Sequence, residues 1–188
     1  MKKLFFSVIL LLSATIFFGS CKDGENASPA GSSITLNGET RPLAKAFAQS
    51  FDPQPGGEDI FYGWALGLTG EGIVYDGDEE EFGGEGDVVL MLLSAINDDS
   101  EELPVGTYTF PYEIGKHSLS TVDVLIDFDS DVDERDSEFE QEEIESAEVT
   151  IAKSGSTYSI NFTVTLEDDK KITGKYVGTI TPAVLFGD

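Results

Sequence analysis

The chain has 188 residues, of which 36 are acidic and 11 basic, and its formal net charge at pH 7 is -25. A surface this negative repels nucleic acid and anionic lipid headgroups, which argues against both as partners and leaves cations and basic proteins. Hydrophobic residues make up 40% of the chain, enough for the core of one globular domain, and the single cysteine excludes a disulfide within the chain.

The first twenty residues have the pattern of a secretory signal peptide. Lys2 and Lys3 precede an apolar run from Leu4 to Phe18, and small residues then lead to Cys21. At about fifteen residues the run is shorter than the roughly 20 needed to span a bilayer. A signal cleaved elsewhere would fit the run as well, but a lone cysteine directly behind it favours cleavage before Cys21. We therefore expect residues 1–20 to be removed and Cys21 to carry fatty acids such as palmitate as a membrane anchor.

The residues behind the cysteine, Lys22-Asp23-Gly24-Glu25, are charged. They resemble the short export tag that follows the acylated cysteine in surface-displayed lipoproteins of the Bacteroidetes type. The resemblance implies an outer-membrane lipoprotein that faces outward, with a periplasm-facing position as the alternative. Residues 26–33 contain only Asn, Ala, Ser, Pro and Gly. Because such a segment cannot bury an apolar face, we expect residues 21–33 to form a flexible tether.

The β domain is expected to begin at Ile34. Asn37-Gly38 follows the first predicted strand and suits the positive φ angles of a tight hairpin turn. Residues 43–51 fit a helix as well as a strand, and the nearby Pro42 and turn favour the strand. From Phe61 to Leu68 bulky residues alternate with small ones, which predicts a strand with one face in the core.

Further strands follow along the chain. The apolar run of residues 88–95 predicts a strand buried on both faces. Residues 107–110 predict a short strand after a turn, and residues 122–128 alternate between apolar and mostly polar positions. The last three strands are expected at 147–153, 157–166 and 171–181, joined by short turns into an antiparallel meander.

About nine strands without an amphipathic helix predict an all-β fold over residues 34–182, followed by a tail at 183–188. We expect a single antiparallel β-sandwich, with an up-and-down, calycin-like β-barrel as the alternative. The closing hairpins resemble those of small Bacteroidetes lipoproteins, a likeness of fold that brings no functional residues with it.

Residues 127–148 contain twelve carboxylates. Five of them have the spacing of ligands in a calcium-binding loop of the EF-hand type, which the segment resembles in part. Val132 stands where that loop has glycine, and no helices are predicted on either side. The alternative is a solvated acidic loop. The candidate Ca²⁺ ligands are Asp127, Asp129, Asp131, Asp133 and Glu138.

A second acidic loop, residues 76–87, is rich in glycine and is expected to form a flexible hairpin. If both acidic loops lie at one end of the domain, they form a negative rim. The only histidine, His117, is expected in a surface turn. The sequence has no Gly-x-Ser-x-Gly motif and too few His and Cys residues for a zinc site, so no catalytic residue is predicted.

The leading prediction is a non-catalytic binding or interaction module at the cell envelope, with a glycan, a basic protein or Ca²⁺ as ligand. The alternative is a carbohydrate-active accessory protein or a hydrolase that uses loop carboxylates. A glycan platform needs exposed aromatic side chains in a row. Tyr75, Phe82 and Tyr112 are the candidates for such a row, whereas Trp64 is predicted to face inward.

Overall fold

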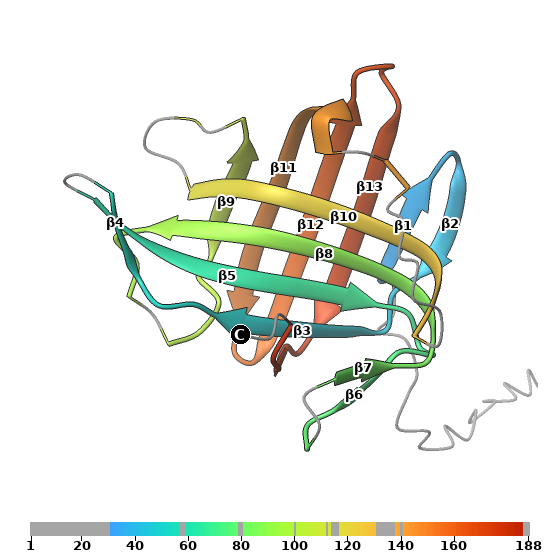
Figure 1. Ribbon diagram of the computed structural model, residues 1–188, viewed down its shortest axis with the longest axis horizontal. Coiled ribbons are helices and arrows are strands. Elements are labelled where there is room, and N and C mark those ends of the chain that lie inside the picture. Colours follow the sequence, from blue (N-terminus) through green and yellow to red (C-terminus); the bar gives the residue numbers. More distant parts are fainter. Residues whose placement is uncertain are drawn as a thin grey trace, which may run out of the picture.

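The computed structural model describes most of the chain from residue 31 onward (Figure 1). The described residues are 31–56, 59–78, 81–99, 101–111, 113, 117–130, 138–139 and 141–185. Cys21 and the predicted signal peptide and tag lie outside them. None of the described residues belongs to a helix long and apolar enough to cross a membrane.

The described chain is almost entirely β, so the predicted fold class is confirmed. It has fourteen strands and one short 3-10 helix, and eight of the strands have five residues or more. The strands are β1 Ser33–Leu36, β2 Glu39–Pro42, β3 Lys45–Ser50, β4 Gln54–Gly56, β5 Asp59–Thr69, β6 Val74–Asp76, β7 Glu81–Gly83, β8 Glu85–Ile96, β9 Gly106–Phe110, β10 His117–Asp129, β11 Ile144–Ser154, β12 Thr157–Leu166, β13 Lys171–Gly178 and β14 Thr181–Pro182; the helix is η1 Gln141–Glu143.

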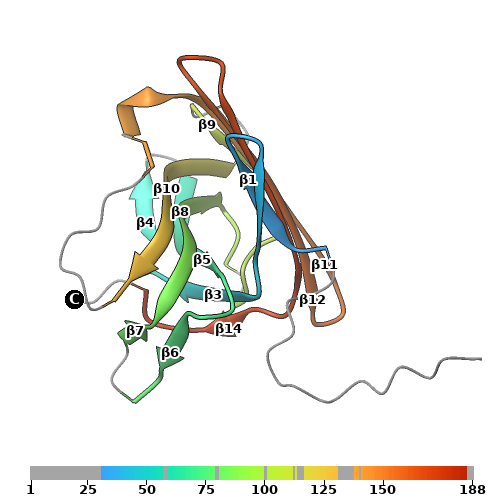
Figure 2. The same cartoon turned by 90° about the vertical axis from the view of Figure 1, so that its right-hand side faces the viewer.

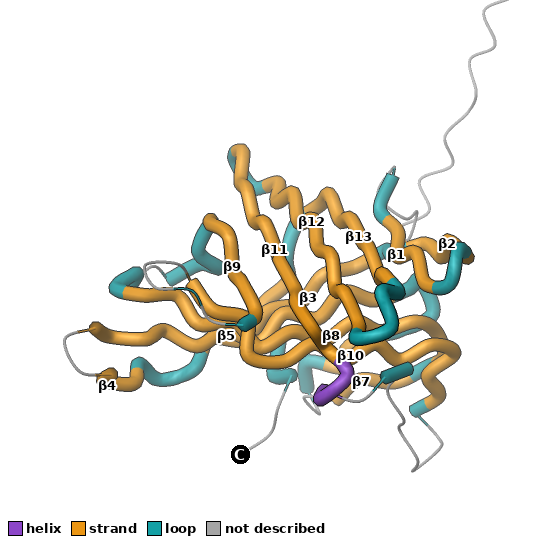
Figure 3. Tube along the Cα trace, turned by 90° about the horizontal axis from the view of Figure 1, so that it is seen from above, coloured by secondary structure: helices purple, strands orange, loops and turns teal. Residues whose placement is uncertain are grey.

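One large sheet contains twelve of these strands, in the order β14-β3-β5-β8-β10-β9-β11-β12-β13-β1-β2, with β4 beside β5. The sheet curls into a half-barrel with two facing walls: β3, β5, β8 and β10 form one, and β11, β12, β13 and β1 form the other (Figure 2). The strands of the two walls cross at a steep angle when seen from above (Figure 3). The walls thus face each other as the layers of a sandwich do, but they belong to one continuous sheet.

The sheet is mixed, and here the structure differs from the predicted antiparallel arrangement. Most neighbours are antiparallel, including the predicted meander of β11, β12 and β13. Two pairs are parallel, β9 with β10 and β14 with β3. The parallel pairing of β9 with β10 covers only two residue pairs, because β9 leaves β10 to pair along its length with β11. This short pairing joins the two walls.

The local sequence patterns explain the strands that line the core. The first hairpin turns at Asn37-Gly38, whose φ angles of 52° and 81° are those a tight turn requires. The segment at residues 43–51 is a strand and not a helix, as predicted. In β8 the run predicted to be buried on both faces is buried on the core side, whereas on the outer side Val88 is buried and Leu90 and Leu92 are half-buried.

Candidate functional site

The predicted calcium ligands are only partly described. Asp127 and Asp129 end β10, Glu138 borders the turn between β12 and β13, and Asp131 and Asp133 lie outside the described residues. Within the described ranges, no three His, Cys, Asp or Glu side chains are grouped so that they could hold a metal ion. The calcium loop therefore stays a prediction.

Asp127 belongs to an ion-pair cluster that ties β2 to the opposite wall. Arg41 Nη1 donates to Asp127 Oδ1 at 2.9 Å and to Asp87 Oδ1 at 3.2 Å, and Arg41 Nε lies 3.1 Å from Glu39. The carboxylate of Asp87, 8% exposed, also accepts the Asp127 N–H. The hydrogen bond that Arg41 donates to the Asp127 carboxylate is the main cause that raises the pKa of Arg41. The cluster therefore connects β2 with β8 and β10 at one open end of the half-barrel.

The two acidic loops meet at this end, as the negative-rim hypothesis requires. The Ser130 N–H donates to the Gly84 carbonyl at 3.1 Å, and the Gly84 N–H donates to Ser130 Oγ at 3.0 Å. The second loop contains the predicted hairpin, which is formed by β6 and β7.

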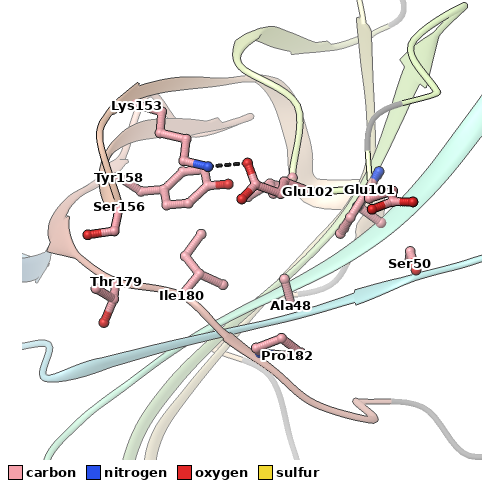
Figure 4. Close-up of a pocket in the computed structure, with 12 residues that line it drawn as sticks. Ala48, Ser50, Glu101, Glu102, Lys153, Ser156, Tyr158, Thr179, Ile180 and Pro182 are labelled. Atoms are coloured by element: carbon pink, nitrogen blue, oxygen red, sulfur yellow. Dashed lines mark hydrogen bonds and ion pairs between the residues drawn. The ribbon is translucent and has the colours of Figure 1, made fainter.

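A cavity of about 410 Å³ lies between the walls, and we call it the end cavity (Figure 4). Five parts of the chain contribute to its lining: β3, β5, residues 101–103, the turn from β11 to β12, and residues 179–182. Apolar groups form much of its surface. Trp64 and Leu103 are nearly fully buried there, and Ile180 and Pro182 complete the apolar part. A largely apolar concavity with a few polar groups is the common form of a ligand site.

The polar groups of the end cavity include one ammonium and two carboxylates. Lys153 Nζ donates a hydrogen bond to Glu102 Oε2 and lies 5.0 Å from the centroid of the Tyr158 ring. The hydrogen bond that Lys153 donates to the Glu102 carboxylate is the main cause that raises the pKa of Lys153, so the amine stays charged. The Lys153 side chain is 21% exposed and that of Glu102 is 70% exposed.

Glu101 supplies the second carboxylate of the end cavity and is exposed. It makes no ion pair or hydrogen bond with any other side chain in the part of the chain that the structure describes. In Figure 4 its carboxylate lies on the opposite side of Glu102 from Lys153. The end cavity therefore combines a paired ammonium with an available carboxylate above an apolar floor.

His117 does not occupy the predicted surface turn. It is the first residue of β10, it is half-buried, and its Nδ1 accepts the Ile96 N–H at 3.0 Å. Its ring lies 4.9 Å from that of Tyr108, centroid to centroid. Because β8 and β10 are neighbours, this histidine links their ends and serves the structure.

Of the three candidates for a glycan platform, the two that the structure describes, Tyr75 and Phe82, do not form an exposed row. Tyr75 and Phe82 are half-buried and pack with Phe47, with ring centroids 4.9 to 5.9 Å apart. The Tyr75 hydroxyl accepts the Val184 N–H at 3.0 Å. Trp64 faces inward, as predicted, at 7% exposure, and Tyr112 lies outside the described residues.

Sequence reasoning missed the charged residues of the end cavity, Glu101, Glu102 and Lys153. In the sequence they are ordinary surface charges beside turns. The only signal is that Lys153 is one of 11 basic residues and is followed at once by the Ser154-Gly155-Ser156 turn.

None of the comparisons with protein families, curated proteins or solved structures gives a match.

Proposed function

We propose that this protein is an outer-membrane lipoprotein, anchored by an acylated Cys21, that binds a ligand in the end cavity of its β domain without catalysis. The observation that carries the binding proposal is the end cavity itself, where an ammonium and two carboxylates border an apolar floor. The loop between β8 and β9 supplies the carboxylates and the end of β11 supplies the ammonium, and functional groups held by a rigid sheet are common in binding proteins.

Binding is favoured over catalysis by the placement of the titratable groups. Histidine is the side chain best suited to act as an acid or base near neutral pH. His117 does not line the end cavity, and its Nδ1 instead accepts a hydrogen bond from the Ile96 N–H. Lys153 is held as a charged amine by Glu102, so it is not available as a base.

The anchor proposal rests on the sequence pattern around Cys21, and the charged tag behind it supports display on the outer surface. The test is expression of the full chain with an alkyne analogue of palmitate. The wild type should incorporate the label and fractionate with the outer membrane, while Cys21→Ser should do neither. Equal labelling of both proteins, or a mature protein that starts at another residue, would contradict the proposal. Protease added to intact cells should cut the protein if it faces outward.

Calcium binding by the loop from Asp127 to Glu138 is a separate proposal, based on its carboxylate spacing. Isothermal titration with CaCl₂ measures it. Heat of binding and a higher melting temperature are expected with Ca²⁺ and not with added NaCl of equal ionic strength. No heat and an unchanged melting temperature at millimolar calcium would overturn it.

A further inference from the structure

We propose that the end cavity recognises an alkylammonium group, that is, a positively charged amine carried on an apolar chain. This inference rests on the proposed function, because it names the class of ligand that the same cavity takes. Three features support it: the ammonium already held there, a second carboxylate and a tryptophan in the same lining, and the charge of the whole chain.

The end cavity already holds one alkylammonium group, the side chain of Lys153. Its Nζ contacts the Glu102 carboxylate on one side and the face of the Tyr158 ring, 5.0 Å away, on the other (Figure 4). A carboxylate combined with an aromatic face is a general way in which proteins hold ammonium ions. The lining therefore has the chemistry that the proposed ligand needs.

The same two kinds of group occur a second time in the lining, without a cation. Glu101 offers an exposed carboxylate, and the indole of Trp64 forms part of the apolar floor. Tryptophan is the strongest of the aromatic side chains in cation–π contacts. Leu103 and Pro182, which also line the end cavity, provide apolar surface for a short hydrocarbon chain.

The negative charge of the end cavity and of the whole chain favours a cationic ligand over an anionic one. The two carboxylates outnumber the ammonium in the lining, and the chain as a whole has a net charge of -25. Such a field attracts cations and repels anions. An anionic ligand would in addition have to displace Glu102 from Lys153, whereas an amine can use the exposed carboxylate of Glu101.

The chain provides its own reporter, because Trp64 is the only tryptophan and lies in the end cavity. The experiment titrates the mature lipoprotein in non-ionic detergent with n-butylammonium chloride and records Trp64 emission. A saturable change is expected that weakens as NaCl is added. The same concentrations of n-butanol and sodium butyrate, which share the chain but not the charge, should leave the emission unchanged.

Variants locate the response. Glu101→Gln should weaken n-butylammonium binding about two- to fivefold, the range expected for an exposed ion pair, and the double change Glu101→Gln with Glu102→Gln should weaken it about tenfold or more. Glu148→Gln is the matched control, since it removes the same charge from an exposed position on β11 outside the end cavity. Its binding should equal that of the wild type.

A second arm separates the two sources of the ammonium group. A Gly-Gly-Lys-Gly-Gly peptide that binds as tightly as n-butylammonium assigns the site to a lysine side chain of a basic polypeptide. A peptide that fails where n-butylammonium binds assigns it to a free amine. Both outcomes support the inference.

The inference is overturned if n-butylammonium leaves Trp64 emission unchanged, or if the double variant binds it as tightly as the Glu148→Gln control. A response to butyrate or to a sugar in place of the amine would overturn the inference while leaving the proposed binding function intact. Failure of the acylation test at Cys21 would bear on the anchor alone.

Discussion

The close packing of Gly174 against Phe162 predicts a large effect from adding one methyl group. Gly174 in β13 lies directly opposite Phe162 in β12, and the Phe162 ring covers the glycine. A Cβ at position 174 would stand 2.1 Å from both Cε1 and Cζ of that ring. Carbon atoms in contact normally lie about 3.5–4.0 Å apart, so Gly174→Ala must displace the ring by more than an ångström.

Phe162 cannot move without disturbing the core, because it is 3% exposed and packs among the side chains between the walls. Overpacking of this kind costs about 1–3 kcal/mol. For a chain of this length each kcal/mol lowers the melting temperature by about 2–4 °C, so we expect Gly174→Ala to lower it by roughly 2–12 °C. Differential scanning calorimetry of the mature lipoprotein measures the shift.

Gly83→Ala is the matched control, because a Cβ at Gly83 would meet no atom within 4 Å. Its melting temperature should stay within about one degree of the wild type, since surface changes of this kind have small effects. The double variant Gly174→Ala with Phe162→Leu should lose less stability than the two single losses added together, because leucine leaves room for the new methyl group. An unchanged melting temperature in Gly174→Ala would refute the reasoning.

Three further predictions concern other parts of the fold. His117→Ala removes the acceptor of the Ile96 N–H and should lower the free energy of unfolding by about 1 kcal/mol in urea titrations; no change would contradict the structural role of His117. Burial raises the pKa of the Asp123 carboxyl, so its negative charge destabilises the native state. Asp123→Asn should therefore have a higher melting temperature than the wild type at pH 7. This difference in melting temperature should vanish below about pH 3.9, where the wild-type carboxyl is protonated in the native and the unfolded state. Arg41→Met should speed amide hydrogen exchange in β2 relative to β12, and equal exchange in both proteins would show that the ion pair with Asp87 does not hold β2.

Much of the fold follows from local patterns, because strands and tight turns leave local signals. In β12 every second side chain from Tyr158 to Leu166 is buried, as the alternation predicts, and Asn37-Gly38 forms the predicted turn. The joining of the walls could not be predicted in this way. It depends on two residue pairs, His117 with Tyr108 and Ser118 with Thr109, and pairing between distant strands has no local sequence signal.

The sites were less predictable, because they depend on residues that are far apart in the chain. Lys153 meets Glu102 across 51 positions, and Arg41 meets Asp127 across 86. The spacing of acidic residues suggested Asp127 as a calcium ligand but gave no indication of its partner. His117 follows Gly115-Lys116, a sequence typical of a turn. In the structure it is the first residue of β10, and its Nδ1 accepts a hydrogen bond from the Ile96 N–H of the neighbouring strand.

The most direct test of the central claim is the affinity of the Lys153→Met variant for n-butylammonium, measured by Trp64 emission. Methionine keeps the apolar stem beside Tyr158 but removes the ammonium that occupies Glu102. If the end cavity recognises alkylammonium groups, the variant removes the ammonium that competes with the ligand for Glu102 and for the face of Tyr158, and it should bind n-butylammonium several-fold more tightly than the wild type. Weaker or unchanged binding of n-butylammonium by Lys153→Met would contradict the claim.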